Sequence, residues 1–415
     1  MIFIDPPTWP GHGRLWSHLI SDTSYAELHA FAASVGIPRR AFERDHYDVI
    51  ADRYESVVAA GARPVRSRDL VAMLHAAGLR RRHRSALAPV VGRRWPRPLQ
   101  AGDLVAVVAP SGPVSPDRLA RGIALLESWG LRVRLQPNVL GRDARLSYLA
   151  ADDHRRAADL SSAWSDPDVA AVWAARGGYG AQRMVDLLDW PAVRAAGPRW
   201  LIGFSDITAL HTRLGRELDV VTVHGPGLAS AEQLDDEVSV AALRSLLMGS
   251  ASMGSASMGS GSSPGSVLVE GVGAVAGVAR GRLVGGNLSL IAADIGVEPA
   301  PEVSSIAVFE DIGENAYRID RMLTQLLRSR WFDQVRGIVV GDLSSGQNAG
   351  SEAADLTAAV ITDRLGRLRI PILAGVPVGH GPRNLALPLG AAVELKVGAP
   401  GPSGPPGPSG TLALV

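Results

Sequence analysis

The sequence predicts an α/β protein with a parallel sheet in its first large region, a β-rich α/β region after it and a small separate α/β module in front. Three observations support this prediction. Between residues 104 and 223, short apolar runs alternate with loops and helical patterns, as in parallel α/β sheets. After residue 267 the chain is rich in Gly and Val. Residues 1–84 differ from both regions and hold six of the ten histidines.

The repeating unit of the first large region is an apolar strand, a loop of small residues and a helix. Parallel strands need such a crossover, so the repeat indicates a Rossmann-like sheet. The predicted strands are 104–109, 131–135, 169–174, 200–204 and 220–223, and the predicted helices are 116–129, 181–188 and 207–218.

Two low-complexity tracts interrupt the second half. Residues 248–262 repeat Met-Gly-Ser, a composition typical of a flexible linker. Residues 398–410 carry Gly at every third position, but four triplets are too few for a collagen helix, so we expect a disordered insertion. The other predicted elements are strands at 267–283, 306–309, 337–340 and 372–378, a helix at 317–329, and a hairpin of 392–397 with 411–415.

These changes in pattern divide the chain into five parts. In the first, we expect a helix at 24–35 capped by Asp22 or Thr23, and another at 67–77 ended by Gly78. The parts are a module at 1–84, an Arg/Pro linker at 85–98, a nucleophile-bearing domain at 99–247, a linker at 248–266 and a C-terminal domain at 267–415.

Composition excludes several kinds of chemistry. The formal net charge of +1 gives no argument for nucleic acid or an anionic membrane as the main partner. Cysteine is absent, which excludes disulfides and a cysteine nucleophile, and Lys396 is the single lysine, which argues against a Schiff-base enzyme. We expect no signal peptide and no membrane helix, and therefore a cytoplasmic protein.

Ser205 lies directly between an apolar run and a helical pattern. At the carboxyl end of a parallel strand, its Oγ would face a crevice, and the first N–H groups of the next helix could hold an oxyanion. Ile207 stands where the lipase-type nucleophile elbow has its second glycine, so the motif is not that of the lipase type. The alternative is that Ser205 only caps the helix.

A nucleophilic serine needs a base, and the base needs a group that orients it. His380 lies among glycines after a predicted strand, and Glu310 directly follows another. Each also fits an ordinary surface residue. His211 and His224 compete as the base: His211 lies two turns into a helix and points away from its start, whereas spacing does not exclude His224.

Short motifs in both halves carry a resemblance to a known family. In the first half they are Gly102-Asp103, Ala109-Pro110-Ser111-Gly112, Trp173–Gly180, Gly203-Phe204-Ser205-Asp206 and His224-Gly225-Pro226. In the second half they are Gly285-Gly286-Asn287-Leu288, Phe309–Glu314, Tyr317–Arg321, and Gly379-His380-Gly381 with Asn384. In this order they resemble the LD-carboxypeptidase family of serine peptidases over roughly residues 99–415. The two low-complexity tracts and residues 1–84 depart from it.

The resemblance implies a Ser–His–Glu triad and a reaction. Ser205 would be the nucleophile, His380 the general base and Glu310 the orienting carboxylate, preferred over Glu314 mainly because of the family. The implied reaction removes the terminal D-alanine from the L,D-peptide bond of murein tetrapeptides through an acyl-enzyme, in peptidoglycan recycling. The resemblance also implies a homodimer without a cofactor or metal.

The remaining substrate contacts are assigned to two loops. The backbone N–H groups of Asp206 and Gly178 would form the oxyanion hole. Arg176 is the candidate that holds the substrate carboxylate, because a guanidinium matches a carboxylate bidentately, with Tyr179 beside it. A salt bridge at the sheet edge is the alternative for Arg176.

Two further functions stay open for this region. The Gly-rich loops 109–112 and 176–180 could cradle a phosphate in a non-catalytic nucleotide-binding protein, although neither matches a dinucleotide or Walker fingerprint. Some members of the resembled family are immunity enzymes that cleave acylated nucleotide antibiotics, which is a related hydrolase function.

Residues 1–84 resemble a bacterial domain of unknown function, which supplies no chemistry. Their basic end, with the linker to Arg97, reads as a solvated connector, with nucleic-acid binding as the alternative. Several side chains are of metal-ligand type, but no tight spacing supports a site, so we interpret them as polar residues of a small fold. They are Asp5, His12, His18, Asp22, His46 and Asp48.

Overall fold

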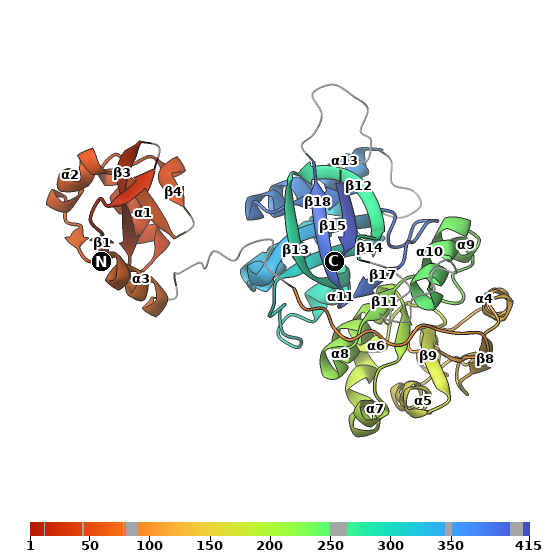
Figure 1. Ribbon diagram of the computed structural model, residues 1–415. Coiled ribbons are helices and arrows are strands. Elements are labelled where there is room, and N and C mark those ends of the chain that lie inside the picture. Colours follow the sequence, from red (N-terminus) through yellow and green to blue (C-terminus); the bar gives the residue numbers. More distant parts are fainter. Residues whose placement is uncertain are drawn as a thin grey trace. The chain divides into compact units, whose positions relative to one another are not determined.

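The computed structural model divides the chain into two compact units, Met1–Ser85 and Ala86–Val415 (Figure 1). Within the described residues, no helix combines the length and apolar character needed to span a bilayer. His12, Gly78 and nearly all of the two low-complexity tracts lie outside the described part. The structure describes residues 1–11, 13–43, 45–77, 79, 90–249, 264–344, 351–398 and 410–415.

The first unit is a mixed sheet with helices on both faces. Its strand order is β4-β5-β3-β1-β6, with β2 paired to β3, and the β1–β6 pair is parallel. The strands are β1 (Ile2–Ile4), β2 (Trp9–Gly11), β3 (Arg14–Ser21), β4 (Phe42–Glu43), β5 (His46–Ile50) and β6 (Arg63–Pro64), and the helices are α1 (Tyr25–Ser34), α2 (Tyr54–Ala59) and α3 (Ser67–Ala76).

Strand alternation divides the core of this unit between the two faces of the sheet. Ile4 packs with one buried cluster and its neighbour Phe3 with the other, because successive side chains of a strand point to opposite faces. The predicted cap of the first helix is wrong: the hydroxyl of Ser24 accepts from the backbone N–H of Glu27, at 3.2 Å. Asp22 instead accepts from the N-terminal amine.

The second unit begins with the predicted parallel sheet. Its order is β17-β11-β10-β9-β7-β8, and only β17 runs antiparallel. Buried clusters cover both faces, as a parallel sheet requires. The strands are β7 (Leu104–Val108), β8 (Arg132–Leu135), β9 (Val169–Ala174), β10 (Trp200–Gly203), β11 (Thr222–His224) and β17 (Leu387–Leu389). The helices are α4 (Pro116–Ser128), α5 (Asp153–Ser165), α6 (Ala181–Met184), α7 (Trp190–Ala196), α8 (Thr208–Leu218), α9 (Ala231–Leu234) and α10 (Glu237–Met248).

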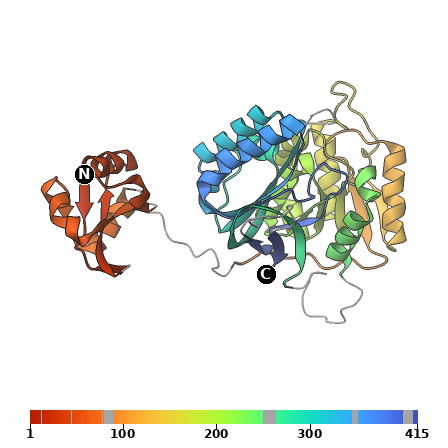
Figure 2. The same ribbon diagram turned by 90° about the horizontal axis from the view of Figure 1, so that it is seen from above.

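The β-rich half closes into a barrel, which the sequence did not predict. The strand order is β12-β16-β15-β14-β13-β18-β19, and the predicted hairpin is confirmed as β18 paired with β19. Figure 2 shows the cyan and blue helices of this half along the outside of the barrel. The strands are β12 (Val267–Val275), β13 (Gly277–Asn287), β14 (Ser305–Ile312), β15 (Val335–Ser344), β16 (Ile372–Ala374), β18 (Ala392–Val397) and β19 (Gly410–Leu414), and the helices are α11 (Leu288–Ala293), α12 (Ala316–Arg328) and α13 (Ser351–Leu365).

Sheet and barrel are interlocked. Strand β17, which the sequence assigned to the C-terminal domain, pairs with β11 of the first sheet. Residues placed in the first linker also pack here: the indole Nε1 of Trp200 donates to the carbonyl of Arg97, at 2.7 Å. Close packing at Gly286 joins the barrel to α8, because a Cβ there would lie 2.6 Å from Oγ1 of Thr208.

We expect Gly122→Ala, in α4, to destabilise the second unit by about 1–3 kcal/mol, the usual cost of overpacking. A Cβ at Gly122 would lie 1.9 Å from the backbone oxygen of Leu228. Because Gly→Ala in a helix ordinarily stabilises by about 1 kcal/mol, a net loss reports this clash. Urea unfolding measures it, with Gly366→Ala, which meets nothing within 4 Å, as the control. Equal stability of Gly122→Ala and wild type would contradict the packing.

Candidate active site

Ser205 lies at a strained turn between β10 and α8. It opens the 3₁₀ helix Ser205–Ile207 with a φ of 62°, in the left-handed region that costs a non-glycine residue roughly 1–3 kcal/mol. A left-handed serine between a strand and a helix is a feature that this turn shares with nucleophile elbows, although Ile207 occupies the position of the second glycine of the lipase-type motif. Gly203, two residues before Ser205, lies in a place with little room for a side chain, because a Cβ there would lie 3.0 Å from the Cβ of Ala174. Among the described residues, no side chain caps the 3₁₀ helix.

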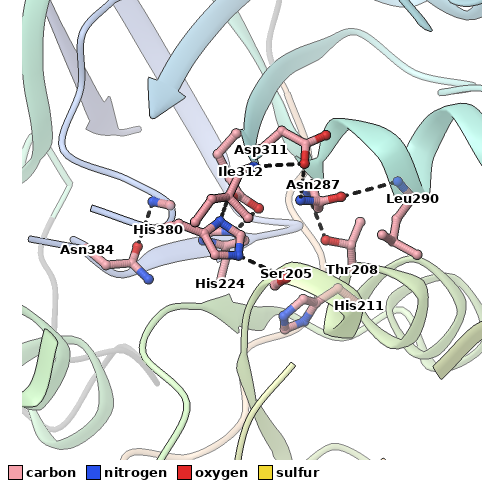
Figure 3. A network of polar contacts seen from close by, with 12 residues as sticks. Ser205, Thr208, His211, His224, Asn287, Leu290, Asp311, Ile312, His380 and Asn384 are labelled. Carbon is pink, nitrogen blue, oxygen red and sulfur yellow. Dashed lines mark hydrogen bonds and ion pairs between the residues drawn. The ribbon is translucent and has the colours of Figure 1, made fainter. Parts of the chain in front are cut away.

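His380 joins Ser205 to Glu310. Its Nε2 lies 3.0 Å from Oγ of Ser205 (Figure 3). Its Nδ1 lies 2.7 Å from Oε2 of Glu310. When Nδ1–H donates to the carboxylate, Nε2 carries the lone pair that can accept the serine proton. The three side chains thus have the hydrogen-bonded order of a catalytic triad.

The competing bases contact other groups. Nε2 of His211 donates to the backbone oxygen of Gly203, at 2.8 Å, and burial lowers the pKa of His211 to about 3. Nε2 of His224 lies 3.5 Å from Oε1 of Glu310. The rival carboxylate Glu314 lies 3.4 Å from an arginine, Arg318, at the surface. Of the candidates, His380 and Glu310 are the pair connected to the serine.

Glu310 is fully buried, and its two imidazole neighbours set its charge. Burial by itself raises the pKa of Glu310, but the contact with His224 and the hydrogen bond from His380 outweigh burial and lower the pKa to about 2. Burial also lowers the pKa of His380, and the Glu310 carboxylate overcomes that effect, so the pKa of His380 is raised. An ionised Glu310 therefore makes His380 a stronger base.

The loop that carries His380 is held from both sides. Nε2 of Gln233 donates to the backbone oxygens of Gly379 and Gly381, at 2.8 and 3.1 Å. Oδ1 of Asn384 accepts from the N–H of Gly379, at 3.0 Å. Sequence reasoning missed Gln233, because no local pattern distinguishes a glutamine in a short helix.

The side chain of Asp206 ties three loops together at the carboxyl ends of the parallel strands. Its Oδ2 accepts from Oγ of Ser111, at 2.6 Å, and from the N–H of Ala181, at 2.8 Å. Burial raises the pKa of Asp206, against these hydrogen bonds. The Gly loop reaches Ser205 closely: a Cβ at Gly177 would lie 3.2 Å from Oγ of Ser205, so only glycine fits.

A cavity of about 410 Å³ opens over the serine. It contains two arginines: Arg176, whose Nη1 donates to the carbonyl of Pro113 at 3.1 Å, and Arg118 from α4. Sequence reasoning missed Arg118, which reads as an exposed helix residue. Tyr179 lies outside this lining and packs against Tyr148, with 5.9 Å between ring centroids. The lining residues are Ser115, Arg118, Arg176, Gly177, Gly178, Phe204, Ser205, Ala229, Ser230 and His380.

Three family models match the chain. Residues 105–225 match the LD-carboxypeptidase N-terminal domain, and residues 280–395 match the LD-carboxypeptidase C-terminal domain. Residues 2–77 match DUF4031, a domain of unknown function. The first two matches include every residue of the Ser205–His380–Glu310 chain.

Similar proteins match between 70% and 75% of this chain. The chain is 43% identical to a putative carboxypeptidase of Streptomyces coelicolor, over 72% of this chain and 92% of that protein. It is 34% identical to a murein tetrapeptide carboxypeptidase of Pseudomonas aeruginosa, over 70% of this chain and 92% of that protein. The crystal structure of muramoyltetrapeptide carboxypeptidase from Oxalobacter formigenes matches with a TM-score of 0.57 and 26% identity. The match covers 75% of this chain and 97% of that chain. The structure of MccF in complex with glutamyl sulfamoyl guanosine matches with a TM-score of 0.59 and 22% identity, and it shares the fold. This match covers 72% of this chain and 94% of that chain.

We expect Ser205 to react more slowly with a fluorophosphonate probe as the pH falls through a midpoint above 6.5. His380 must be unprotonated to accept the serine proton, and Glu310 raises its pKa above the usual 6.5. In Glu310→Gln the midpoint should move to lower pH, and the limiting rate should fall. Rates of covalent labelling between pH 5 and pH 9 measure both.

Glu314→Gln is the control for this pH profile, because Glu314 lies with Arg318 at the surface. Its midpoint should match that of the wild type. An unchanged midpoint in Glu310→Gln, or the same change in Glu314→Gln, would show that Glu310 does not set the basicity of His380.

Proposed function

The chain belongs to the LD-carboxypeptidase family, and from this premise we propose that it hydrolyses the L,D-peptide bond to the terminal D-alanine of murein tetrapeptides. The observation that carries the proposal is the hydrogen-bonded chain Ser205–His380–Glu310 at a cavity that also holds two arginines. A relative named murein tetrapeptide carboxypeptidase supports the substrate. In this role the enzyme would recycle cell-wall peptides in the cytoplasm.

The first half of the reaction forms an acyl-enzyme. Oγ of Ser205 attacks the carbonyl carbon of the L-configured centre, while Nε2 of His380 takes the hydroxyl proton. The N–H groups of Asp206 and Gly178 would hold the developing oxyanion. The C–N bond then breaks, and His380 gives its proton to the leaving amine of D-alanine.

The second half releases the tripeptide. A water molecule enters the position of the D-alanine, and His380 takes one of its protons as the oxygen attacks the acyl carbon. The C–O bond to Ser205 breaks, and His380 returns the proton to Oγ. Glu310 stays ionised throughout, because its low pKa keeps it negative beside the imidazolium that forms in each half.

The substrate ends in a carboxylate, which an exopeptidase has to recognise. Arg176 and Arg118 are the charged groups in the lining of the cavity apart from His380. A guanidinium holds a carboxylate through two parallel hydrogen bonds. We assign Arg176 to this contact because it adjoins the Gly loop packed on Ser205.

Hydrolysis of an acylated nucleotide is the rival function on the same fold. The likeness to MccF concerns the fold alone, and the fold does not decide the substrate. A purified protein that cleaves an aminoacyl nucleotide sulfamate and leaves the murein tetrapeptide intact would favour this rival. A nucleotide-induced rise in melting temperature without acylation of Ser205 would favour a binding protein.

We expect Ser205→Ala to lose carboxypeptidase activity by about 10⁴–10⁶-fold, because the triad acts as a unit. Mass spectrometry of a murein tetrapeptide should show the loss of one alanine with the wild type and none with the variant. Ser128→Ala is the control, because that hydroxyl bonds the carbonyl of Leu125 in α4 and should leave the rate unchanged. Alanine release by Ser205→Ala would refute the assigned nucleophile.

We expect Arg176→Ala to lower kcat/KM for the tetrapeptide by about 10–100-fold, the value of hydrogen bonds to a charged group. The wild type should prefer a free C-terminal carboxylate over the C-terminal amide of the same peptide. Arg176→Ala should lose this preference, whereas a structural role would slow both substrates equally. An unaltered preference would transfer the carboxylate contact to Arg118.

A further inference from the structure

Three side chains that can bind a metal ion, two histidines and one aspartate, meet on one face of the sheet in the first unit. His18 lies on β3, directly opposite Asp48 on the antiparallel strand β5. His46 stands two residues before Asp48, so both point to the same side of β5. The strand register therefore gathers two imidazoles and one carboxylate that lie far apart in the sequence.

The ligand atoms of these side chains face one another. Oδ1 of Asp48 lies 3.3 Å from Nε2 of His46 and 4.0 Å from Nε2 of His18, and all three atoms lie within 4.8 Å of one another. The ligands of a tetrahedral Zn²⁺ with bonds of about 2.0 Å are separated by about 3.3 Å. The His46–Asp48 pair has this separation. Small rotations of the His18 side chain would shorten the distances from its Nε2 to the other two ligand atoms.

A buried carboxylate supports each histidine from behind. Nδ1 of His18 lies 3.1 Å from Oδ2 of Asp5, and Nδ1 of His46 lies 2.7 Å from Oδ1 of Asp45. Asp5 and Asp45 are only 1% and 2% exposed. Asp5 is fixed further, because it accepts from the indole Nε1 of Trp9 at 3.0 Å. Metal-binding histidines characteristically donate their second N–H to such a carboxylate.

This arrangement sets where the lone pairs point. A histidine that donates Nδ1–H to a carboxylate in its neutral form carries its lone pair on Nε2. Both Nε2 atoms then face the anionic oxygen of Asp48, and this arrangement of three electron-rich atoms suits a cation between them. We propose that His18, His46 and Asp48 bind a divalent transition-metal ion, with Zn²⁺ the best match to two imidazoles and one carboxylate.

Solvent can reach the proposed site. The side chain of Asp48 is 39% exposed and that of His18 is 24% exposed. Three protein ligands on a partly open surface leave at least one coordination position for water or another small ligand, which distinguishes this site from a closed structural zinc site.

The structure also separates the other candidate ligands of this unit from the cluster. Asp22 contacts the N-terminal amine, and Asp5 supports His18 from behind. His29 bonds the hydroxyl of Tyr47 through Nδ1, at 3.0 Å. Asp22 therefore fits the interpretation from the sequence, in which the candidate ligands are ordinary polar groups. The strand register instead brings His18, His46 and Asp48 together.

Metal stoichiometry and affinity of the full, tag-free chain test the proposal. After treatment with a chelator and dialysis, Zn²⁺ should rebind at one ion per chain in isothermal titration calorimetry. His18→Gln, His46→Gln and Asp48→Asn should each abolish this binding or weaken it by more than 100-fold. Asp45→Asn, which removes only the supporting carboxylate of His46, should weaken it by about 10–100-fold.

Two controls separate this site from loss of folding and from other histidines. His29→Gln should bind Zn²⁺ like the wild type. Co²⁺ in place of Zn²⁺ should give d–d absorption typical of low coordination number in the wild type and in Ser205→Ala, and none in Asp48→Asn with a wild-type circular dichroism spectrum. Absent Zn²⁺ binding, or binding unchanged in Asp48→Asn and His46→Gln, would overturn the proposal and leave the cluster as an ion-pair network.

Discussion

The ionised carboxylate of Glu310 is the group on which the rest of the site depends. A fully buried charge is stable only when hydrogen bonds offset the loss of water. The hydrogen bond to Glu310 comes from His380, in the loop after barrel strand β16, and its second imidazole neighbour, His224, lies at the end of β11 in the parallel sheet. Because both halves contribute, the contacts that keep the buried Glu310 ionised form only when sheet and barrel are correctly packed together.

The second constraint is the backbone of Ser205. A left-handed serine is retained only where its surroundings determine it. Here the Gly177 backbone packs on one side, and the buried Asp206 carboxylate fixes the neighbouring loops on the other. Packing elsewhere in the sheet thus offsets the strain of the turn, and Ser205 lies in the lining of the cavity.

Periodicity revealed the parallel sheet, because its strands and crossover helices each have a local sequence pattern. Ser205 could be selected for the same reason, because it follows a recognisable buried strand, whereas Glu310 was preferred over Glu314 mainly because of the family resemblance. Barrel closure has no such signal, since it depends on pairing between strands as distant as β12 and β19. Contacts such as Gln233 to the His380 loop were missed because they join distant segments. The cluster around Asp48 was missed for the same reason, because strand register alone creates it.

The antiparallel strand β17 has a consequence for how the chain is made. On the ribosome, the nucleophile half emerges first, yet β11 keeps an unpaired edge until residues 387–389 have been translated. An open edge invites association with other nascent strands. Completion of that sheet is therefore coupled to synthesis of nearly the entire polypeptide, and a truncated product would contain the serine without the architecture that activates it.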